Sequence, residues 1–223
     1  MFDAHRHLSL AFPKENALYA TSKKSEWPRL LESGDKAMGG IGILPPELPI
    51  DVSDIYDLLR AHPELQIAEV GLDRRYPDTD GQALFLRTML HIGFELGRSV
   101  SLHCVREDGL LLSLLGSEAK YLPPLLWHGC TASLETVTQA VRYTVIPSYG
   151  PSLYTSRLAQ EIKHLIRMPF VLETDFTGQE QDYTTTFSRH IAAFSRHSGY
   201  SEEQLETHNN EIRAILTHNQ TSR

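Results

Sequence analysis

Short runs of apolar residues alternate with amphipathic stretches along the whole chain. The apolar runs have the length of β-strands and cover residues 1–5, 17–21, 37–44, 66–70, 100–104, 124–128, 144–147 and 170–175. Apolar residues recur at helical spacing in residues 52–62, 81–97, 110–119, 134–143, 153–167 and 187–198, and in a final helix that follows Ser201. Gly97 is placed to end one helix, and Ser201 with Gln204 forms a capping box for the last. The pair Asn209-Asn210 is a candidate interruption of that last helix.

Strands that alternate with helices predict a parallel sheet. Eight such units in 223 residues favour a closed, compact (β/α)8 TIM barrel with extra C-terminal helices. An open doubly wound sheet is the alternative, but no strand is followed by its glycine-rich nucleotide fingerprint. The chain has no linker-like stretch and no internal repeat, so we expect a single domain over residues 1–223.

Composition excludes several classes of protein. Hydrophobic residues make up 41% and charged residues 22%, as in soluble globular proteins. The formal net charge of −7 argues against a protein that coats nucleic acid by charge. The sequence shows neither a secretory signal nor an apolar run of about 20 residues, so we expect a soluble, cytoplasmic protein. Cys104 and Cys130 are too few for a disulfide framework and are expected to be reduced, buried thiols.

Polar side chains at the ends of the predicted strands are the candidate site. In a barrel, the carboxyl ends of all strands meet at one mouth, where active sites form. Six residues with metal-binding side chains occupy such positions: His5, His7, Glu69, His103, His128 and Asp175. Each has a structural alternative, such as a core imidazole bonded to a carbonyl, an ion pair of Glu69 with Arg74 or Arg75, or a helix cap by Asp175. Together the six favour a metal site.

Four imidazoles and two carboxylates exceed the needs of one catalytic ion, which takes about three protein ligands. A set of this size suits two ions about 3.5–4 Å apart, with a carboxylate able to bridge them. Mixed nitrogen and oxygen ligation favours Zn, Mn, Fe or Ni, with Mg as a weaker alternative.

Ordered blocks of sequence support this interpretation. They are Phe-Asp-Ala-His-Arg-His-Leu at 2–8, Ala-Glu-Val-Gly-Leu-Asp at 68–73, Leu-His-Cys-Val-Arg-Glu at 102–107, His-Gly-Cys at 128–130 and Leu-Glu-Thr-Asp at 172–175. In these blocks the chain resembles the TatD-related metal-dependent hydrolases, a branch of the amidohydrolase-like barrels that includes DNases. A weaker block at 40–45 looks like the Gly-Ile-His-Pro stretch of that family, with Leu44 in place of the histidine. The loop that follows Asp175 also departs from the family pattern.

The resemblance implies a (β/α)8 barrel that hydrolyses a phosphoester, often in DNA. It assigns one metal to His5, His7, Glu69 and Asp175, and makes Glu69 the bridge to a second metal held by His103 and His128. In the leading hypothesis, a two-metal phosphoesterase or deoxyribonuclease, a metal-activated water attacks phosphorus and Asp175 orients that water and takes its proton.

Candidate substrate-binding residues are less distinctive. Arg74 and Arg106, with Arg75, are candidates to hold phosphate oxygens, with salt bridges to Asp73, Glu107 or Asp108 as the alternative. Tyr76 and Trp127 are candidates to stack a base, although packing is the simpler explanation. Glu173 is a candidate to support a metal ligand from behind.

Other functions stay open. The same barrel could hydrolyse an amide, lactone or C–N bond, although Glu69 stands where the sister enzymes often carry a modified lysine. The polymerase-and-histidinol-phosphatase family also opens with His-x-His, but usually has a histidine soon after the last aspartate, and here none follows Asp175 until His190. A scaffold protein that has lost activity is the last alternative. We expect a monomer that reaches a phosphoester or DNA end through its metals and does not bind membranes.

Overall fold

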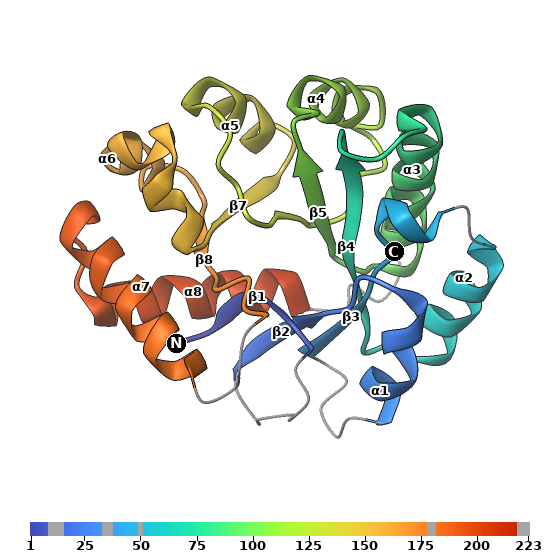
Figure 1. Ribbon diagram of the computed structural model, residues 1–223, viewed down its shortest axis with the longest axis horizontal. Coiled ribbons are helices and arrows are strands. Elements are labelled where there is room, and N and C mark those ends of the chain that lie inside the picture. Colours follow the sequence, from blue (N-terminus) through green and yellow to red (C-terminus); the bar gives the residue numbers. More distant parts are fainter. Residues whose placement is uncertain (9–15, 33–37, 49–50, 178–181, 218–223) are drawn as a thin grey trace.

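The computed structural model describes residues 1–8, 16–32, 38–48, 51–177 and 182–217. Eight parallel strands form one sheet in the order of the sequence, which is the (β/α)8 TIM barrel predicted above (Figure 1). The strands are β1 (Asp3–His7), β2 (Ala17–Ala20), β3 (Gly39–Ile41), β4 (Gln66–Asp73), β5 (Val100–Val105), β6 (Leu125–Trp127), β7 (Val145–Tyr149) and β8 (Val171–Leu172). Each overlaps a predicted apolar run, because parallel strands covered on both faces consist mostly of buried residues. Strands β1, β4, β5 and β7 extend past the predicted end by one to three residues.

Helices lie around the outside of the strands (Figure 1). They are α1 (Trp27–Glu32), α2 (Val52–Ala61), α3 (Thr79–Leu96), α4 (Asp108–Ser117), α5 (Leu134–Val141), α6 (Ile162–Leu165), α7 (Tyr183–Ser198) and α8 (Glu202–Thr217). Helix α3 ends at Gly97, whose left-handed backbone (φ 65°) confirms the predicted stop. The capping box is also confirmed, because the backbone N–H of Gln204 donates to Ser201 Oγ at 3.1 Å and the backbone N–H of Ser201 donates to Gln204 Oε1 at 2.8 Å.

One helix prediction is wrong in its extent, and one helix was not predicted. The predicted helix over residues 153–167 is divided into 3₁₀ segments Pro151–Thr155 and Arg157–Glu161 followed by the short α6. Ser156 between them has extended backbone (ψ 162°), which no continuous helix can contain. The other error is α1, a six-residue helix that the sequence pattern did not predict because it is too short to show a period.

The barrel closes where β8 meets β1. Asp175 N–H donates to the carbonyl of His5 at 2.9 Å, and His7 N–H donates to the carbonyl of Phe176 at 3.1 Å. Asn209 of α8 fastens the same seam: its Nδ2 donates to the Phe2 carbonyl (2.7 Å) and the Leu172 carbonyl (3.1 Å), and its Oδ1 accepts from Leu172 N–H (3.2 Å). Helix α8 runs without a break from Glu202 to Thr217, so the expected interruption at Asn209 is wrong.

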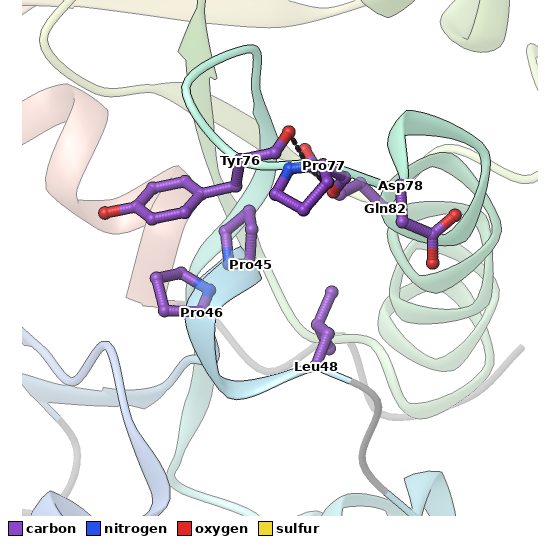
Figure 2. Close-up of a pocket in the computed structure, with 7 residues that line it drawn as sticks. All are labelled: Pro45, Pro46, Leu48, Tyr76, Pro77, Asp78 and Gln82. Atoms are coloured by element: carbon purple, nitrogen blue, oxygen red, sulfur yellow. Dashed lines mark hydrogen bonds between the residues drawn. The ribbon is translucent and has the colours of Figure 1, made fainter.

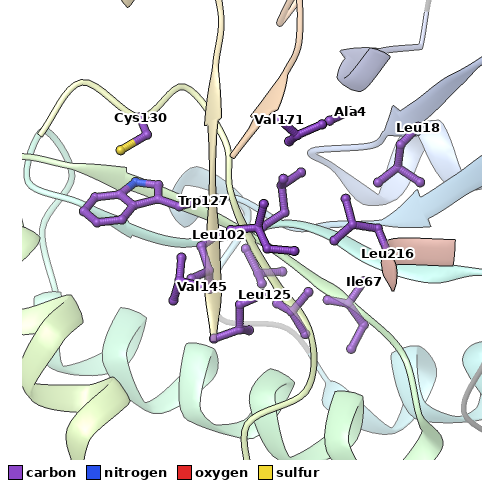
Figure 3. Close-up of a cluster of buried hydrophobic side chains, with 14 of the residues drawn as sticks. Ala4, Leu18, Ile67, Leu102, Leu125, Trp127, Cys130, Val145, Val171 and Leu216 are labelled. Carbon is purple, nitrogen blue, oxygen red and sulfur yellow. The ribbon is translucent and has the colours of Figure 1, made fainter. Parts of the chain in front are cut away.

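Apolar side chains fill the barrel and the layer beneath the helices. Figure 3 shows one such cluster, which includes Leu102, Leu125 and Val145 from three neighbouring strands. Trp127 belongs to it and is 2% exposed, so it packs in the core and is not available to stack a base. Cys130 is buried and Cys104 half-buried, both as free thiols, and burial raises the pKa of each, to about 12 for Cys130. No helix in the described ranges is long and apolar enough to cross a membrane.

Candidate metal centre

Strand β1 carries two imidazoles at its carboxyl end. His5 is fully buried, and its Nδ1 lies 3.1 Å from the hydroxyl of Ser101 on β5. That contact leaves His5 Nε2 buried without a hydrogen-bond partner. His7, two residues on, is 21% exposed. The alternation of a strand thus turns both rings toward the barrel interior and its mouth.

Glu69 lies within β4, where the pairing of β4 with β5 shifts register between Ile67 and Val70. Its backbone has φ 45°, the left-handed region that a non-glycine residue rarely adopts. Such irregularities re-aim side chains and are frequent beside active sites. Here the carboxylate, 4% exposed, has Oε2 3.5 Å from His7 Nδ1 and no hydrogen bond to that oxygen.

His103 of β5 and His128, which follows β6, complete the inner side of the cluster. Their facing nitrogens, His103 Nδ1 and His128 Nε2, are 3.2 Å apart. Each of these nitrogens is 3.7 Å from Glu69 Oε1. The ring of His128 stacks on that of His5 at 4.0 Å between centroids, so three imidazoles surround one buried carboxylate.

Asp175 follows β8 and also has left-handed backbone (φ 49°). Its Oδ1 is 3.2 Å from His7 Nε2 and 4.0 Å from His5 Nε2. It is the most exposed of the six candidates, with 43% of its side chain accessible, and therefore stands at the mouth of the barrel.

Asp73, a carboxylate on the far side of the His103 ring, was not predicted as part of the site. Asp73 Oδ2 lies 3.3 Å from His103 Nε2, on the side of the ring that faces away from Glu69. Arg75 holds this carboxylate by Nε and Nη2, and these hydrogen bonds with that of His103 outweigh burial and lower the pKa of Asp73 to about 2. A carboxylate that fixes the orientation of a histidine is common behind metal ligands. The sequence carried no signal for this contact, because it depends on the register of β4 against β5.

The candidate ligand atoms form two overlapping groups. His5, Glu69 and His128 form one, and His5, His7 and Asp175 form the other, with all atoms of a group within 4.8 Å of one another. Ligands about 2.0–2.2 Å from a zinc ion are separated by distances of roughly this order. The unpartnered His5 Nε2 and Glu69 Oε2 supply electron pairs that no hydrogen bond uses, so the donor set fits divalent cations.

Electrostatics agree with cation binding. Burial lowers the pKa of His5 and His103, and that of His128 to about 3, so these three rings are neutral and have free lone pairs at neutral pH. Burial raises the pKa of Glu69 to about 7. A cation at this carboxylate would remove that destabilisation of its charged form.

The ion pair of His7 with Asp175 at the mouth has pKa shifts of the opposite sign. Burial opposes the charge of both partners, but the hydrogen bond between His7 and Asp175, with the charge of Glu69, raises the pKa of His7. The same hydrogen bond lowers the pKa of Asp175. Asp175 is therefore ionised at neutral pH.

The predicted substrate-binding residues lie at the carboxyl ends of β4 and β5. Arg75 is bound to Asp73 as described, which is the structural alternative given for it. Arg74 is 71% exposed, with Nε 3.8 Å from Glu107 Oε1, and Arg106 is exposed with φ 58°. The structure does not bring either arginine into contact with the six candidate ligands, so their role in substrate binding stays a prediction.

Glu173 supports the loop after His128. This buried carboxyl group accepts a hydrogen bond from Gly129 N–H at 2.6 Å, directly beside that histidine. Burial, and then the charge of Asp175, raises its pKa well above the ordinary value. Its expected supporting role therefore has a physical basis in the backbone next to a candidate ligand.

Comparisons with known proteins agree with the fold. The chain is similar to the crystal structure of YJJV, a TatD homologue from Escherichia coli K12, with a TM-score of 0.76, 17% identity, and coverage of 96% of this chain and 97% of that one. No curated protein matches the chain significantly. The family model described as TatD related DNase matches residues 15–219, a range that begins after His5 and His7, so the place of these two residues in the site rests on geometry. The chain belongs to the TatD related DNase family of metal-dependent hydrolases.

Proposed function

We propose that this protein hydrolyses phosphodiester bonds at DNA ends with two divalent ions. The observation that carries the proposal is the buried Glu69 carboxylate, which lies 3.5–3.7 Å from nitrogens of His7, His103 and His128. A carboxylate in that position can bridge two ions, which is the arrangement of many two-metal phosphoesterases. The description of the family as DNases supports the same substrate class.

His5, His7 and Asp175 would hold one ion and His103 and His128 the other, with Glu69 shared between them. When bound, the two ions lower the pKa of a water toward about 7 and offset charge on the phosphoryl oxygens. The mixed nitrogen and oxygen donors favour Zn, Mn, Fe or Ni, with Mg less suited.

Asp175 orients the attacking water and accepts its proton. It is ionised, it is the most accessible carboxylate of the cluster, and the hydrogen bond from His7 fixes its position. Arg74 and Arg106, exposed at the ends of neighbouring strands, contact the phosphate oxygens. Because the net charge is −7, the substrate is held by the metal centre and these few cations and not by a basic surface.

The experiment is removal of metal by a chelator followed by addition of Mn²⁺, Zn²⁺, Ni²⁺ or Mg²⁺ separately. Hydrolysis of bis-p-nitrophenyl phosphate, single-stranded DNA and a lactone is then measured as a function of pH. We expect at least one ion to restore cleavage of both phosphodiesters. If the lactone alone is hydrolysed, the amidohydrolase alternative replaces this proposal, and if no ion restores any turnover, the scaffold alternative does.

Three expectations from the sequence stay predictions: a single domain, a monomeric state and a cytoplasmic location. Size-exclusion chromatography with light scattering tests the monomeric state directly, with a mass near 25.2 kDa expected.

A further inference from the structure

A pocket of about 280 Å³ lies at the carboxyl ends of β3 and β4, on the same side of the barrel as the candidate metal centre. Figure 2 shows the rings of Tyr76, Pro45 and Pro46 together on the left of the picture, with Asp78 on the right and Leu48 below. Tyr76 is 38% exposed, so its ring is accessible, in contrast to the buried Trp127. The pocket is therefore an open slot lined by an accessible aromatic ring and by rigid apolar proline rings.

The β4 side of this slot is held in place by Gln82 of α3, which is 2% exposed. Its Nε2 donates to the carbonyls of Tyr76 (3.2 Å) and Pro77 (3.1 Å), and its Oε1 accepts from Asp73 N–H at 2.7 Å. Its Nε2 also donates to the Asp73 carbonyl at 3.3 Å. A buried amide that ties four backbone groups fixes the loop before any ligand arrives, which reduces the entropy lost on binding.

The same loop leads directly to the metal centre. Asp73, at the end of β4, contacts His103 on one side of the loop, and Arg75 connects this carboxylate to the slot. The Arg75 guanidinium carbon lies over the Tyr76 ring, 5.9 Å from its centroid. A ligand in the slot would thus be bound beside the half of the site that contains His103.

The lining selects the chemistry of the ligand. Among the described residues, none of those that line the slot is basic, and its one carboxylate, on Asp78, already accepts a hydrogen bond from Gly81 N–H. Pockets for small molecules begin at about 300 Å³, so this one admits a single ring system. We propose that the slot binds the base of the nucleotide adjacent to the scissile phosphate, stacked on Tyr76. This inference rests on the proposed function.

The first test measures binding without catalysis. Saturation-transfer NMR with thymidine and the metal-free protein is compared for wild type, Tyr76→Ala and Tyr76→Phe. Tyr121→Ala is the matched control, because Tyr121 is also an exposed tyrosine (50%) but follows α4, before the amino end of β6. We expect transfer to the base protons in wild type, Tyr76→Phe and Tyr121→Ala, and its loss in Tyr76→Ala. Equal transfer in Tyr76→Ala and wild type would overturn the proposal.

The second test uses the metal-loaded protein and two single-stranded oligonucleotides, one complete and one lacking the base next to the cleaved bond. Base stacking of this kind predicts that Tyr76→Ala raises KM for the complete strand about tenfold, equivalent to about 1.4 kcal/mol, and leaves KM for the base-free strand unchanged. Equal effects on both strands would contradict the slot while leaving the proposed function intact. Absence of turnover in every variant, with thymidine binding still dependent on Tyr76, would contradict the proposed function and leave the slot standing.

Discussion

Replacing Asn209 by alanine should open the seam of the barrel. The side chain is fully buried and supplies three hydrogen bonds, to the carbonyls of Phe2 and Leu172 and to the N–H of Leu172. Alanine would leave one buried amide and two carbonyls without these partners, and each such loss costs about 1–3 kcal/mol. We take about 1 kcal/mol for each carbonyl, because a carbonyl has a second lone pair, and about 2 kcal/mol for the N–H. The free energy of unfolding should therefore fall by about 4 kcal/mol. In a domain of this size that corresponds to a fall in Tm of about 8–16 °C.

Urea denaturation of the metal-free protein, followed by circular dichroism, measures this loss as a change in midpoint at constant m-value. Asn210→Ala is the matched control, because Asn210 is the next residue of α8 and is exposed. Its effect should stay within about 0.5 kcal/mol. A loss below about 1 kcal/mol for Asn209→Ala, or equal losses for both variants, would refute the assigned role of the amide. Because His5 and Asp175 meet at the same seam, we also expect Asn209→Ala to bind metal more weakly.

Three further predictions concern pH, packing and catalysis. Burial lowers the pKa of His190 to about 4 against about 6.5 when unfolded, so the neutral ring should stabilise the fold fully above pH 6.5. The free energy of unfolding should fall by about 3 kcal/mol as pH falls from 6.5 to 4. Urea titrations at pH 7 and pH 4 should show a smaller fall for His190→Gln than for wild type, and an equal fall in both proteins would contradict this assignment. A Cβ on Gly71 would lie 1.9 Å from the His103 carbonyl oxygen, whereas one on Gly109 would meet nothing within 4 Å. Gly71→Ala should therefore melt well below wild type, whereas Gly109→Ala should melt close to wild type. A melting curve like that of wild type for Gly71→Ala would contradict the close approach of β4 to β5 at this residue. Asp175→Asn should retain metal but lose about 100-fold or more in kcat, with the exposed Asp182→Asn as control; full activity in Asp175→Asn would reject its role as proton acceptor.

The fold was largely predictable because its strands are buried on both faces and stand out as apolar runs. The exceptions have physical causes. Leu158, Ile162 and Leu165 are buried at helical spacing, but the extended backbone of Ser156 separates them from the buried Leu153. Asn209 looked like a helix breaker because asparagine has low helix propensity, but three tertiary hydrogen bonds outweigh a penalty below about 1 kcal/mol.

The candidate ligands were predictable because a charged or imidazole side chain in an apolar strand is costly unless it has a function. What surrounds them was not. The contact of Asp73 with His103 depends on the register of β4 against β5, and the left-handed backbone of Glu69 depends on a shift in that register. Neither can be read from residue spacing along one strand. Similarly, only the structure separates Tyr76, which is accessible, from Trp127, which is in the core.

The central claim is that Glu69 joins two divalent ions in one site. Its most direct test is elemental analysis of protein reconstituted with Mn²⁺ or Zn²⁺ near neutral pH and freed of excess ion, for wild type, Glu69→Gln and the exposed control Glu203→Gln. We predict two ions per chain in wild type and Glu203→Gln, and at most one in Glu69→Gln, with melting curves showing that all three are folded. Fewer than two ions in saturated wild type, or two ions retained in folded Glu69→Gln, would contradict the account.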